Sequence, residues 1–370
     1  MELIHTDEQE QLRSSLRRFF EDKSPTSEVR RLMAEGKHDP VVWKQMADQL
    51  GLQGLAIPEE YGGSGYTFVE LAIVMEEQGR ALLVAPYFAT VALAAQAVLD
   101  LGDADASAAV LPGIADGSTT ATLAITEQSG NWDIDSIALE ARPADGGYTL
   151  HGVKSYVIDG ATVDQLIVAA KAPGGLSLFL VAGDAEGVTR VNEPPLDQTR
   201  GLATITFDGA QATLLGAEGA AAQSLPTTMN KALVALAAEQ LGGARKAMEM
   251  AVEYTKIREA FDRTIASFQA TKHKAANMFT KVETTKVSVH YGSWAAADNS
   301  EDLPVVASML KSWASDAYFF CAANNIQMHG GIGFTWEHDA HLYLKRAKAS
   351  QLIFGDDIYH NEELAERIGI

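Results

Sequence analysis

The chain has 370 residues, of which 47% are hydrophobic and 21% are charged, the balance of a folded globular protein. This length predicts two or three packed domains. The formal net charge is −20, so nucleic acid and anionic membrane surfaces would repel the protein and are poor candidate partners.

The single cysteine, Cys321, excludes an intrachain disulfide and is typical of a protein from a reducing cytoplasm. It lies in the aromatic helical run "YFFCAANN", so we expect its thiol to be buried and inert. The chain opens on the polar sequence "MELIHTDEQEQ", so we expect no signal peptide. The longest apolar stretch, residues 81–95, contains Pro86 and is shorter than the roughly 20 residues that a membrane-spanning helix needs. We therefore expect a cytoplasmic protein without a membrane span.

Residues 1–118 are predicted to form an N-terminal α-helical domain. Thr6 and Gln9 have the spacing of a capping box, in which a hydroxyl and an amide satisfy backbone donors at the start of a helix. Helical patterns follow over residues 41–50 and 68–79, and the turn-rich sequence "PEEYGGSGY" separates them. The alanine-rich run "ATVALAAQAVLDLG" continues this domain.

Residues 119–219 are predicted to form a middle β domain. The β-prone runs are short and are divided by the turn sequences "ADGG", "APGG" and "GDAEG". They read "ATLAIT", "SIALEAR", "YTLHGVKSYVI", "QLIVAA", "LSLFLVA" and "ATITFDG". This punctuation is typical of antiparallel strands, so we expect an antiparallel β-barrel or sandwich.

Residues 220–370 are predicted to form a C-terminal helical bundle. Long helical patterns cover residues 231–261, 264–297 and 304–330. Helices of this length with short connections favour an antiparallel four-helix bundle. The expected fold class is therefore α+β, in the order helical domain, β domain and bundle.

A metal centre is not expected, although four histidines gather late in the chain. They are His329, His338, His341 and His360. No H-E-x-x-H motif or cysteine–histidine pairing accompanies them. We interpret them as surface or helix-capping residues.

Two stretches of the bundle have the composition of a phosphate site. In "IREAFDRTIASFQ", Arg258 and Phe261 are expected one helical turn apart. In "QMHGGIGF", Gly330 and Gly331 allow a close approach of the backbone to another group. An arginine fork and glycine N–H groups would cradle a pyrophosphate, with Phe261 as an apolar wall. The alternative is a helix C-cap beside a surface arginine, and the residues alone leave both interpretations open.

The order of the domains, with "REAFDRTIASFQ" and "QMHGGIGFTWEHDAHLYLKRAK", resembles the flavin-dependent acyl-CoA dehydrogenases over essentially the whole chain. In that family a carboxylate removes the α proton of an acyl-CoA, and the β hydrogen leaves as hydride to FAD. The flavin ring rests on the β domain of one subunit, while the bundle of a neighbour grips the pyrophosphate and adenosine. The resemblance implies that six residues bind FAD across the subunit interface: Arg258, Phe261, Gln269, Gln327, Gly330 and Gly331.

The chain departs from the family pattern at the flavin face of its own β domain. The family loop T-E-P-G-x-G-S-D reads "TEQSGNWD" here, which keeps Thr126, Glu127 and Asp133 but places Trp132 where a small hydroxyl residue is expected. The following W-I-T/S-N-G segment reads "YVIDG". Ile158 therefore replaces the hydroxyl residue, and its side chain cannot donate a hydrogen bond to the flavin.

The catalytic base of the family is also absent from both of its usual positions. Phe354 stands at the glutamate position of the Y-E-G-T loop, and Ala232 stands 26 residues before Arg258, where another branch keeps its base. Neither side chain can accept a proton. Asp356 and Glu239 are the nearest substitutes in sequence. We interpret Asp356 as the cap of the last helix and Glu239 as the partner of a neighbouring helix.

The chain thus keeps the residues that bind FAD in this family but lacks the catalytic base. In this combination it resembles the non-catalytic β subunit of actinobacterial α2β2 acyl-CoA dehydrogenases, which act in steroid and cholesterol side-chain catabolism. This resemblance implies a homologous catalytic α subunit, an acyl-CoA substrate and electron-transferring flavoprotein as acceptor. One alternative is a self-sufficient homotetramer that uses Asp356 or Glu239 as base. Another is a flavin-free scaffold, which would not need the FAD-binding residues.

Overall fold

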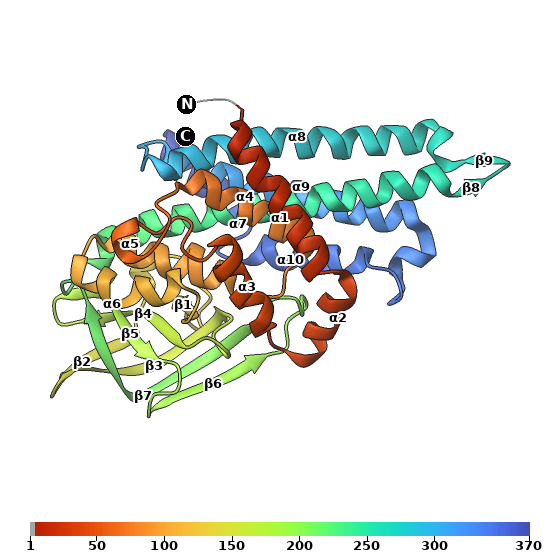
Figure 1. Cartoon of the computed structure of the whole chain (residues 1–370). Coiled ribbons are helices and arrows are strands. Elements are labelled where there is room, and N and C mark those ends of the chain that lie inside the picture. The colour runs from red at the N-terminus through yellow and green to blue at the C-terminus, as the bar shows by residue number, and fades with distance from the viewer. Residues whose placement is uncertain (1–3) are drawn as a thin grey trace. The chain divides into compact units, whose positions relative to one another are not determined.

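Residues 4–370 are described by the computed structural model, which confirms the α+β order of helices, β domain and helices (Figure 1). The chain divides into two units. The first contains the residues up to Arg31 together with Phe68–Leu83 and Leu233–Ile370, and the second contains Leu32–Thr67 and Val84–Ala232. The domain boundaries at residues 118/119 and 219/220 stay predictions.

The first unit is helical. Its helices are α1 (Asp7–Lys23), α4 (Phe68–Ala81), α8 (Gln269–Ala297), α9 (Leu303–His329), α10 (Ala340–Leu352) and α11 (Asp357–Ile368). Two helices cross the boundary between the units, α2 (Thr26–Glu35) and α7 (Ala221–Ile257). The capping box at the start of α1 is confirmed, because the Thr6 hydroxyl accepts from the Gln9 N–H while the Gln9 side chain accepts from the Thr6 N–H.

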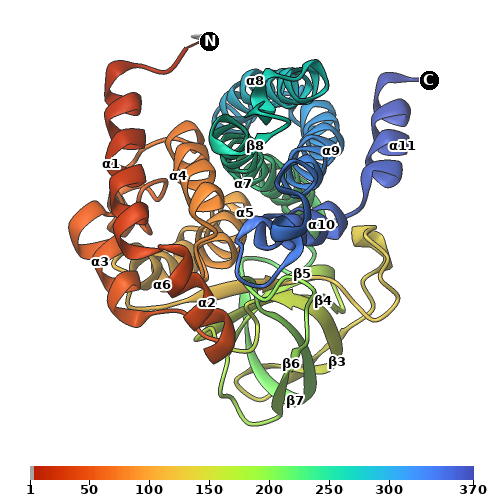
Figure 2. The ribbon, with the colours of Figure 1, turned by 90° about the vertical axis from the view of Figure 1, so that its right-hand side faces the viewer.

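The junction between α7 and α8 differs from the prediction (Figures 1 and 2). The expected helix over residues 231–261 ends at Ile257, and α8 begins only at Gln269. Between them lie a hairpin, β8 (Glu259–Ala260) and β9 (Arg263–Thr264), and a short 3₁₀ turn, Ile265–Ser267. Phe261 and Asp262 form the hairpin turn with φ values of 55° and 61°, the left-handed pair that a type I′ turn needs. A right-handed helix cannot continue through them, so the prediction that Arg258 and Phe261 lie one helical turn apart is wrong.

Two glycines bring α4 and α7 into backbone contact. A Cβ atom on Gly79 would lie 2.1 Å from the carbonyl oxygen of Glu239, and one on Gly242 would lie 1.8 Å from that of Glu76. Both distances are far below van der Waals contact, so a side chain at either position would force the helices apart.

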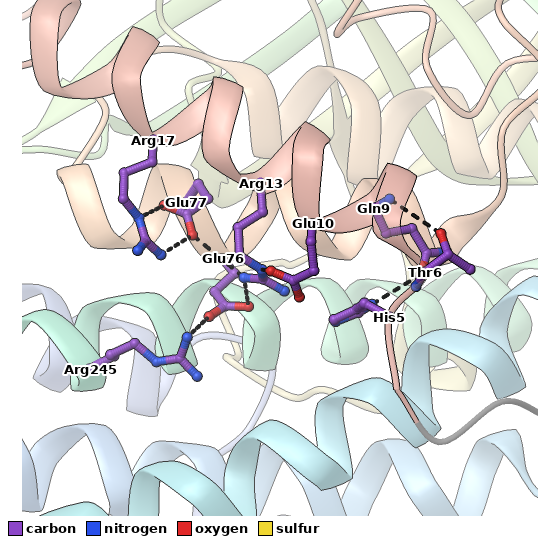
Figure 3. A network of polar contacts seen from close by, with 9 residues as sticks. All are labelled: His5, Thr6, Gln9, Glu10, Arg13, Arg17, Glu76, Glu77 and Arg245. Atoms are coloured by element: carbon purple, nitrogen blue, oxygen red, sulfur yellow. Dashed lines mark hydrogen bonds and ion pairs between the residues drawn. The ribbon is translucent and has the colours of Figure 1, made fainter.

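Buried charges join α1, α4 and α7 beside this contact (Figure 3). Arg13 Nη1 lies 2.5 Å from Glu76 Oε2, and Arg245 Nη1 lies 3.0 Å from Glu76 Oε1. Arg17 makes a two-pronged contact with Glu77, at 2.7 and 3.0 Å. Burial by itself raises the pKa of Glu76, but Arg13 and Arg245 hold that pKa below its usual value. The carboxylate therefore stays charged inside the unit and ties three helices together.

The second unit carries the β domain and several shorter helices. The helical elements are α3 (Pro40–Leu50), a 3₁₀ turn (Glu59–Tyr61), a π-helix (Phe88–Ala95), α5 (Gln96–Leu101), α6 (Ala104–Ala115) and a 3₁₀ turn (Ile134–Ser136). Asp39 caps α3 by accepting from the N–H groups of Val41 and Val42. The alanine-rich run that was predicted as an ordinary helix begins with wider π turns.

Seven strands form the sheet of this unit within the described residues. They are β1 (Ala121–Ala124), β2 (Glu140–Ala144), β3 (Gly147–Ile158), β4 (Gln165–Ala172), β5 (Gly175–Ala182), β6 (Val188–Glu193) and β7 (Leu202–Leu215). The pairings β4–β5, β5–β7, β7–β3, β3–β2 and β2–β4 close a ring, so the domain is a barrel. Strand β6, which was not predicted, adds to β7. The barrel is not wholly antiparallel, because β1 and β2 both pair with β4 in parallel.

The buried network generates a stability prediction. Glu76→Gln should lower the free energy of unfolding by about 3 kcal/mol, because it removes the carboxylate closest to the buried guanidinium of Arg13 and the one that pairs with the part-buried Arg245. Urea denaturation at pH 7 measures this change. Glu253→Gln is the matched control, because Glu253 pairs with Lys256 on the surface of α7, and it should cost less than about 1 kcal/mol.

The same variant has a defined pH dependence. A carboxyl whose pKa is lowered by folding contributes stability above its unfolded pKa, about 4.3 for glutamate, and loses it as the pH falls further. The difference between the wild type and Glu76→Gln should therefore shrink below about pH 4. A difference that stays constant down to pH 3 would contradict the charged state of Glu76.

Candidate cofactor-binding and catalytic site

Arg258 and Phe261 lie where α7 passes into the hairpin. Arg258 directly follows the helix, and its N–H still donates to the carbonyl of Tyr254 at 2.9 Å. Its side chain is exposed, and Phe261 at the tip of the hairpin is 89% exposed. Phe261 therefore has a large apolar side chain in water and a left-handed backbone, and its ring does not belong to the core of the chain. It has the properties of a contact for another molecule.

Gln327, Gly330 and Gly331 lie together at the other end of the site, where α9 stops. Gln327 is exposed in the last turn of α9, and Gly330 caps the helix with a φ of 67°. A short 3₁₀ segment, Gly330–Phe334, follows. A Cβ atom on Gly330 or Gly331 would meet no atom of the chain within 4 Å, so the backbone here is open to a ligand.

A hollow of about 410 Å³ brings part of this set together. It is lined by Thr255, Ala260, Phe261, Ile265, Phe268, Ala270, Thr271, Lys274, Gln327 and Met328. Phe261 and Gln327 thus share one cavity, whereas Arg258, Gln269 and the two glycines lie outside its described lining. Gln269 is the exposed first residue of α8.

The hollow adds two residues that the sequence did not single out. Phe268 packs edge-to-face against Phe261 at 6.2 Å, and the guanidinium of Arg263 lies 3.9 Å from the Phe268 ring centre. Lys274 lines the cavity and donates to Asn324 at 3.0 Å. No sequence signal marks Lys274, because exposed lysines recur along α8 and only the fold brings this one near Gln327.

These residues fit the adenosine diphosphate half of FAD. Arg258 and Lys274 supply positive charge, and the unobstructed backbone at Gly330 and Gly331 leaves room for a phosphate group. The Gly330 N–H itself is used by the helix cap, where it donates to the carbonyls of Ile326 and Gln327. Phe261 and Phe268 supply flat apolar walls. The arrangement can bind a phosphorylated, ring-bearing ligand, but it contains no group poised for acid–base chemistry.

Both positions that the family uses for its base are enclosed by the chain. Ala232 is fully buried in α7, and Phe354 is 8% exposed, with a φ of 59°. Two buried side chains hold the loop around Phe354. Lys311 Nζ donates to the carbonyls of Gln351 (2.9 Å) and Gly355 (2.8 Å), and His360 Nε2 bonds the Phe354 carbonyl at 2.8 Å.

Burial lowers the pKa of Lys311 to about 7 and that of His360 to about 4. Both groups bond backbone carbonyls of the loop, and Lys311 Nζ also donates to the Ser315 hydroxyl at 3.3 Å. The loop is therefore fixed independently of the side chain at position 354, and this side chain carries no titratable group.

The two alternative carboxylates are occupied in structural roles, as predicted. Glu239 is 2% exposed and receives a hydrogen bond from Arg346 Nη1 at 2.9 Å. Asp356 caps α11, where its Oδ1 accepts from the Tyr359 N–H at 2.9 Å. The last helix, α11, begins at Asp357, three residues before the polar sequence "HNEELAERIG".

The loop of the β domain that carries Glu127 is pinned to β3. Glu127 accepts from the fully buried Lys154 at 2.9 Å and from the N–H groups of Ala138 and Leu139. Burial lowers the pKa of Lys154 to about 8. Asp133 caps the 3₁₀ turn Ile134–Ser136. Trp132 is half-buried and Ile158 is buried. Neither side chain has a hydroxyl group to present at this face of the β domain.

Three aromatic residues of the described chain adopt left-handed backbone conformations, which are rare for bulky side chains. They are Tyr156 (φ 55°), Phe261 (φ 55°) and Phe354 (φ 59°). Tyr156 opens the "YVIDG" segment at a break in the register of β3 with β7 and is 55% exposed. Such strain persists only where the surrounding structure enforces it, and it concentrates at functional sites.

The interpretation of the late histidines as surface residues is wrong for three of them. His329, His341 and His360 are buried, because helix packing covers positions that look polar in sequence. His338 does act as a cap, since its Nδ1 accepts from the Ala340 N–H at 3.1 Å. Residues 4–370 contain no cluster of side chains suited to a metal ion.

The expectation for Cys321 is confirmed, since it is buried and its burial raises the pKa of the thiol to about 12. Among the described helices, none has the length and apolar character needed to cross a membrane.

Among the solved structures with the same fold, one is a steroid ACAD and another is a complex of two differently named chains. A variant of the Tcur3481-Tcur3483 steroid ACAD is 30% identical, with a TM-score of 0.89, and the match covers 98% of both chains. The ChsE4-ChsE5 complex from Mycobacterium tuberculosis, at 24% identity and a TM-score of 0.90, shows the same fold over 100% of this chain and 99% of that one.

Sequence comparison gives the family directly. The model of the acyl-CoA dehydrogenase N-terminal domain matches residues 6–118, and that of the C-terminal domain matches residues 222–369. Acyl-CoA dehydrogenase IpdE2 of Mycolicibacterium smegmatis is 31% identical over 352 residues, which cover 95% of each chain. The chain therefore belongs to the acyl-CoA dehydrogenase family.

Proposed function

We propose that this chain is the completing subunit of a heteromeric α2β2 acyl-CoA dehydrogenase. It would hold the adenosine diphosphate half of an FAD whose flavin ring rests on a homologous catalytic subunit. The observation that carries the proposal is the contrast between two regions of the chain. Exposed binding groups remain at the ends of α7 and α9, whereas Phe354 and Ala232 fill both base positions.

Each residue of the grip has a role that suits its chemistry. Arg258 would pair with the pyrophosphate, and the backbone at Gly330 and Gly331, which no side chain obstructs, would lie against it. Phe261 would cover an apolar face of the adenosine, and the amides of Gln269 and Gln327 would complete the polar contacts. When bound, FAD supplies the acceptor for the hydride that leaves the substrate. The base that removes the α proton would come from the partner.

The chain's own β domain is poorly suited to a second flavin ring. Ile158 is buried and cannot donate a hydrogen bond, and Trp132 takes the place of a small hydroxyl residue. A heterotetramer of this kind would contain two active sites rather than four, which leaves room for a bulky substrate.

The substrate and electron acceptor are inferred from relatives rather than from a pocket. Similarity to a steroid ACAD supports a steroid side-chain CoA thioester as substrate. Electron-transferring flavoprotein is proposed as acceptor because it serves this family, and the cytoplasm is proposed as the compartment. The reaction class is the α,β-dehydrogenation of an acyl-CoA.

The first alternative, a self-sufficient homotetramer, needs a carboxylate that can reach substrate. Glu239 faces Arg346 inside the helical unit, and Asp356 faces the start of α11. A general base must approach its proton to about 3 Å, directly or through one water. The second alternative, a flavin-free scaffold, leaves the exposed Phe261 and the open glycines without a purpose.

Arg258→Ala tests the grip directly. In the purified complex, this change should weaken FAD binding by roughly 10- to 100-fold, the effect of losing a hydrogen bond to a charged group. Arg142→Ala is the matched control, because Arg142 is exposed on β2 and pairs with Glu140, two residues away on the same strand. Flavin absorbance after dialysis gives the FAD content. Equal FAD content in both variants would sink the proposed function.

The variant Asp356→Asn distinguishes the proposed completing subunit from a self-sufficient homotetramer that uses Asp356 as its base. Asparagine caps a helix about as well as aspartate, so stability should be unchanged, while the carboxylate is removed. Turnover of the complex should stay within about twofold of the wild type. A base contributes about 100- to 10,000-fold to the rate, so a loss of that size would identify Asp356 as the base.

A further inference from the structure

Three aromatic rings, one pair stacked and one pair tilted, lie in contact between the two halves of the proposed FAD grip and are called the stack below. Tyr254 of α7 lies face to face with His329 at the end of α9, with ring centres 4.3 Å apart and planes at 29°. His338 covers His329 at 4.3 Å, with planes at 51°. The stack thus joins α7, α9 and the segment that enters α10.

The stack lies directly beside the FAD-binding residues in the chain. Tyr254 lies one helical turn before Arg258, and its carbonyl accepts the Arg258 N–H. His329 directly precedes Gly330. The contact between these two rings therefore sets the spacing between the arginine and the glycine loop.

The glycine loop is also folded tightly over His329. A Cβ atom on Gly333 would lie 2.8 Å from the Cβ of His329, so only glycine permits this approach. His329 Nδ1 lies 2.8 Å from the Asn325 carbonyl, which requires a proton on Nδ1 and fixes the orientation of the ring. The imidazole is 6% exposed and acts as the support beneath the loop.

His338 is oriented by a hydrogen bond to the start of α10. Its Nδ1 accepts the N–H of Ala340, so this nitrogen must keep its lone pair. Protonation of Nδ1 would set one N–H against another and break the cap of α10. Protonation of both histidines would also place two positive charges at stacking distance inside the fold.

Charged groups of α2 and α10 surround the three rings. From α2, Arg30 donates to the His338 carbonyl, to Asp339 at 2.9 Å, and contacts His341 at 3.4 Å. The carboxylate of Asp339 is thus engaged by Arg30, and Lys345 of α10 lies over the nearby Trp336 ring. Burial lowers the pKa of His329, and His338 lowers it further. The stacked state therefore binds fewer protons than the open state and loses stability as the pH falls below about 6.5.

We propose that Tyr254, His329 and His338 are positioning residues whose stacked rings hold Arg258 and the glycine loop at the spacing that binds the FAD pyrophosphate, and that acid releases this hold. The inference rests on the proposed function, because it concerns the same grip. It predicts that FAD is retained at neutral pH and released at mildly acidic pH.

Two variants of His338 test the proposal in the assembled complex. His338→Asn keeps an acceptor for the Ala340 N–H, and His338→Phe keeps an aromatic ring, but neither can take up a proton. Between pH 7.5 and 5.5 the wild type should weaken its FAD binding by up to about tenfold, the limit for one histidine with an unfolded pKa near 6.5, as measured from the fluorescence of released flavin. At least one variant should lose most of this pH dependence. His273→Asn, on the exposed surface of α8, is the control and should keep it.

A second readout does not depend on FAD. Hydrogen exchange of residues 330–334, corrected for its intrinsic pH dependence, should accelerate at pH 5.5 in the wild type but not in the His338 variants. Equal pH profiles in the wild type and both variants, by both readouts, would overturn the inference. Failure of the proposed function is distinguishable, because Arg258→Ala would then leave FAD content unchanged whatever the exchange shows.

Discussion

Two buried carboxylates on facing helices, Glu76 and Glu239, organise the helical unit through their arginine partners. Glu76 holds Arg13 and Arg245, while Glu239 holds Arg346 of α10. The glycine contact between α4 and α7 brings both carboxylates to the same place. Removing one member would weaken the compensation of a buried charge, so the set stabilises one arrangement of four helices. The same pairing engages Glu239 with Arg346 inside the helical unit.

The functional consequences appear at the far end of α7. A helix held along its length by packing and ion pairs delivers Arg258 and the hairpin at a defined point. There the chain accepts an unfavourable backbone at Phe261 and exposes its ring to water. Strain and exposure together indicate that the hairpin is built for another molecule. The loop at Phe354 differs from the hairpin in exposure. Its backbone is also left-handed, but the side chain of Phe354 is enclosed by the chain.

Much of the fold could be predicted from the residues because its signals are local. Turn sequences divided the β domain correctly, and Thr6 with Gln9 marked the start of α1. Counting from Arg258 located Ala232. The break after Ile257 could not be predicted, because "REAF" is compatible with a helix and the left-handed turn contains no glycine. The parallel pairing of β1 with β4, the burial of His329 and the place of Lys274 depend on contacts between distant segments, which local patterns do not encode.

The central claim is that this chain completes a flavin site that it cannot use alone. The most direct test is the FAD content of the purified chain, compared with that of the chain co-expressed with a homologous catalytic subunit. We expect a colourless protein alone and about one FAD per pair of unlike chains in the complex, the stoichiometry of two sites per α2β2 assembly. A yellow protein that carries about one FAD per chain and oxidises an acyl-CoA without a partner would contradict it.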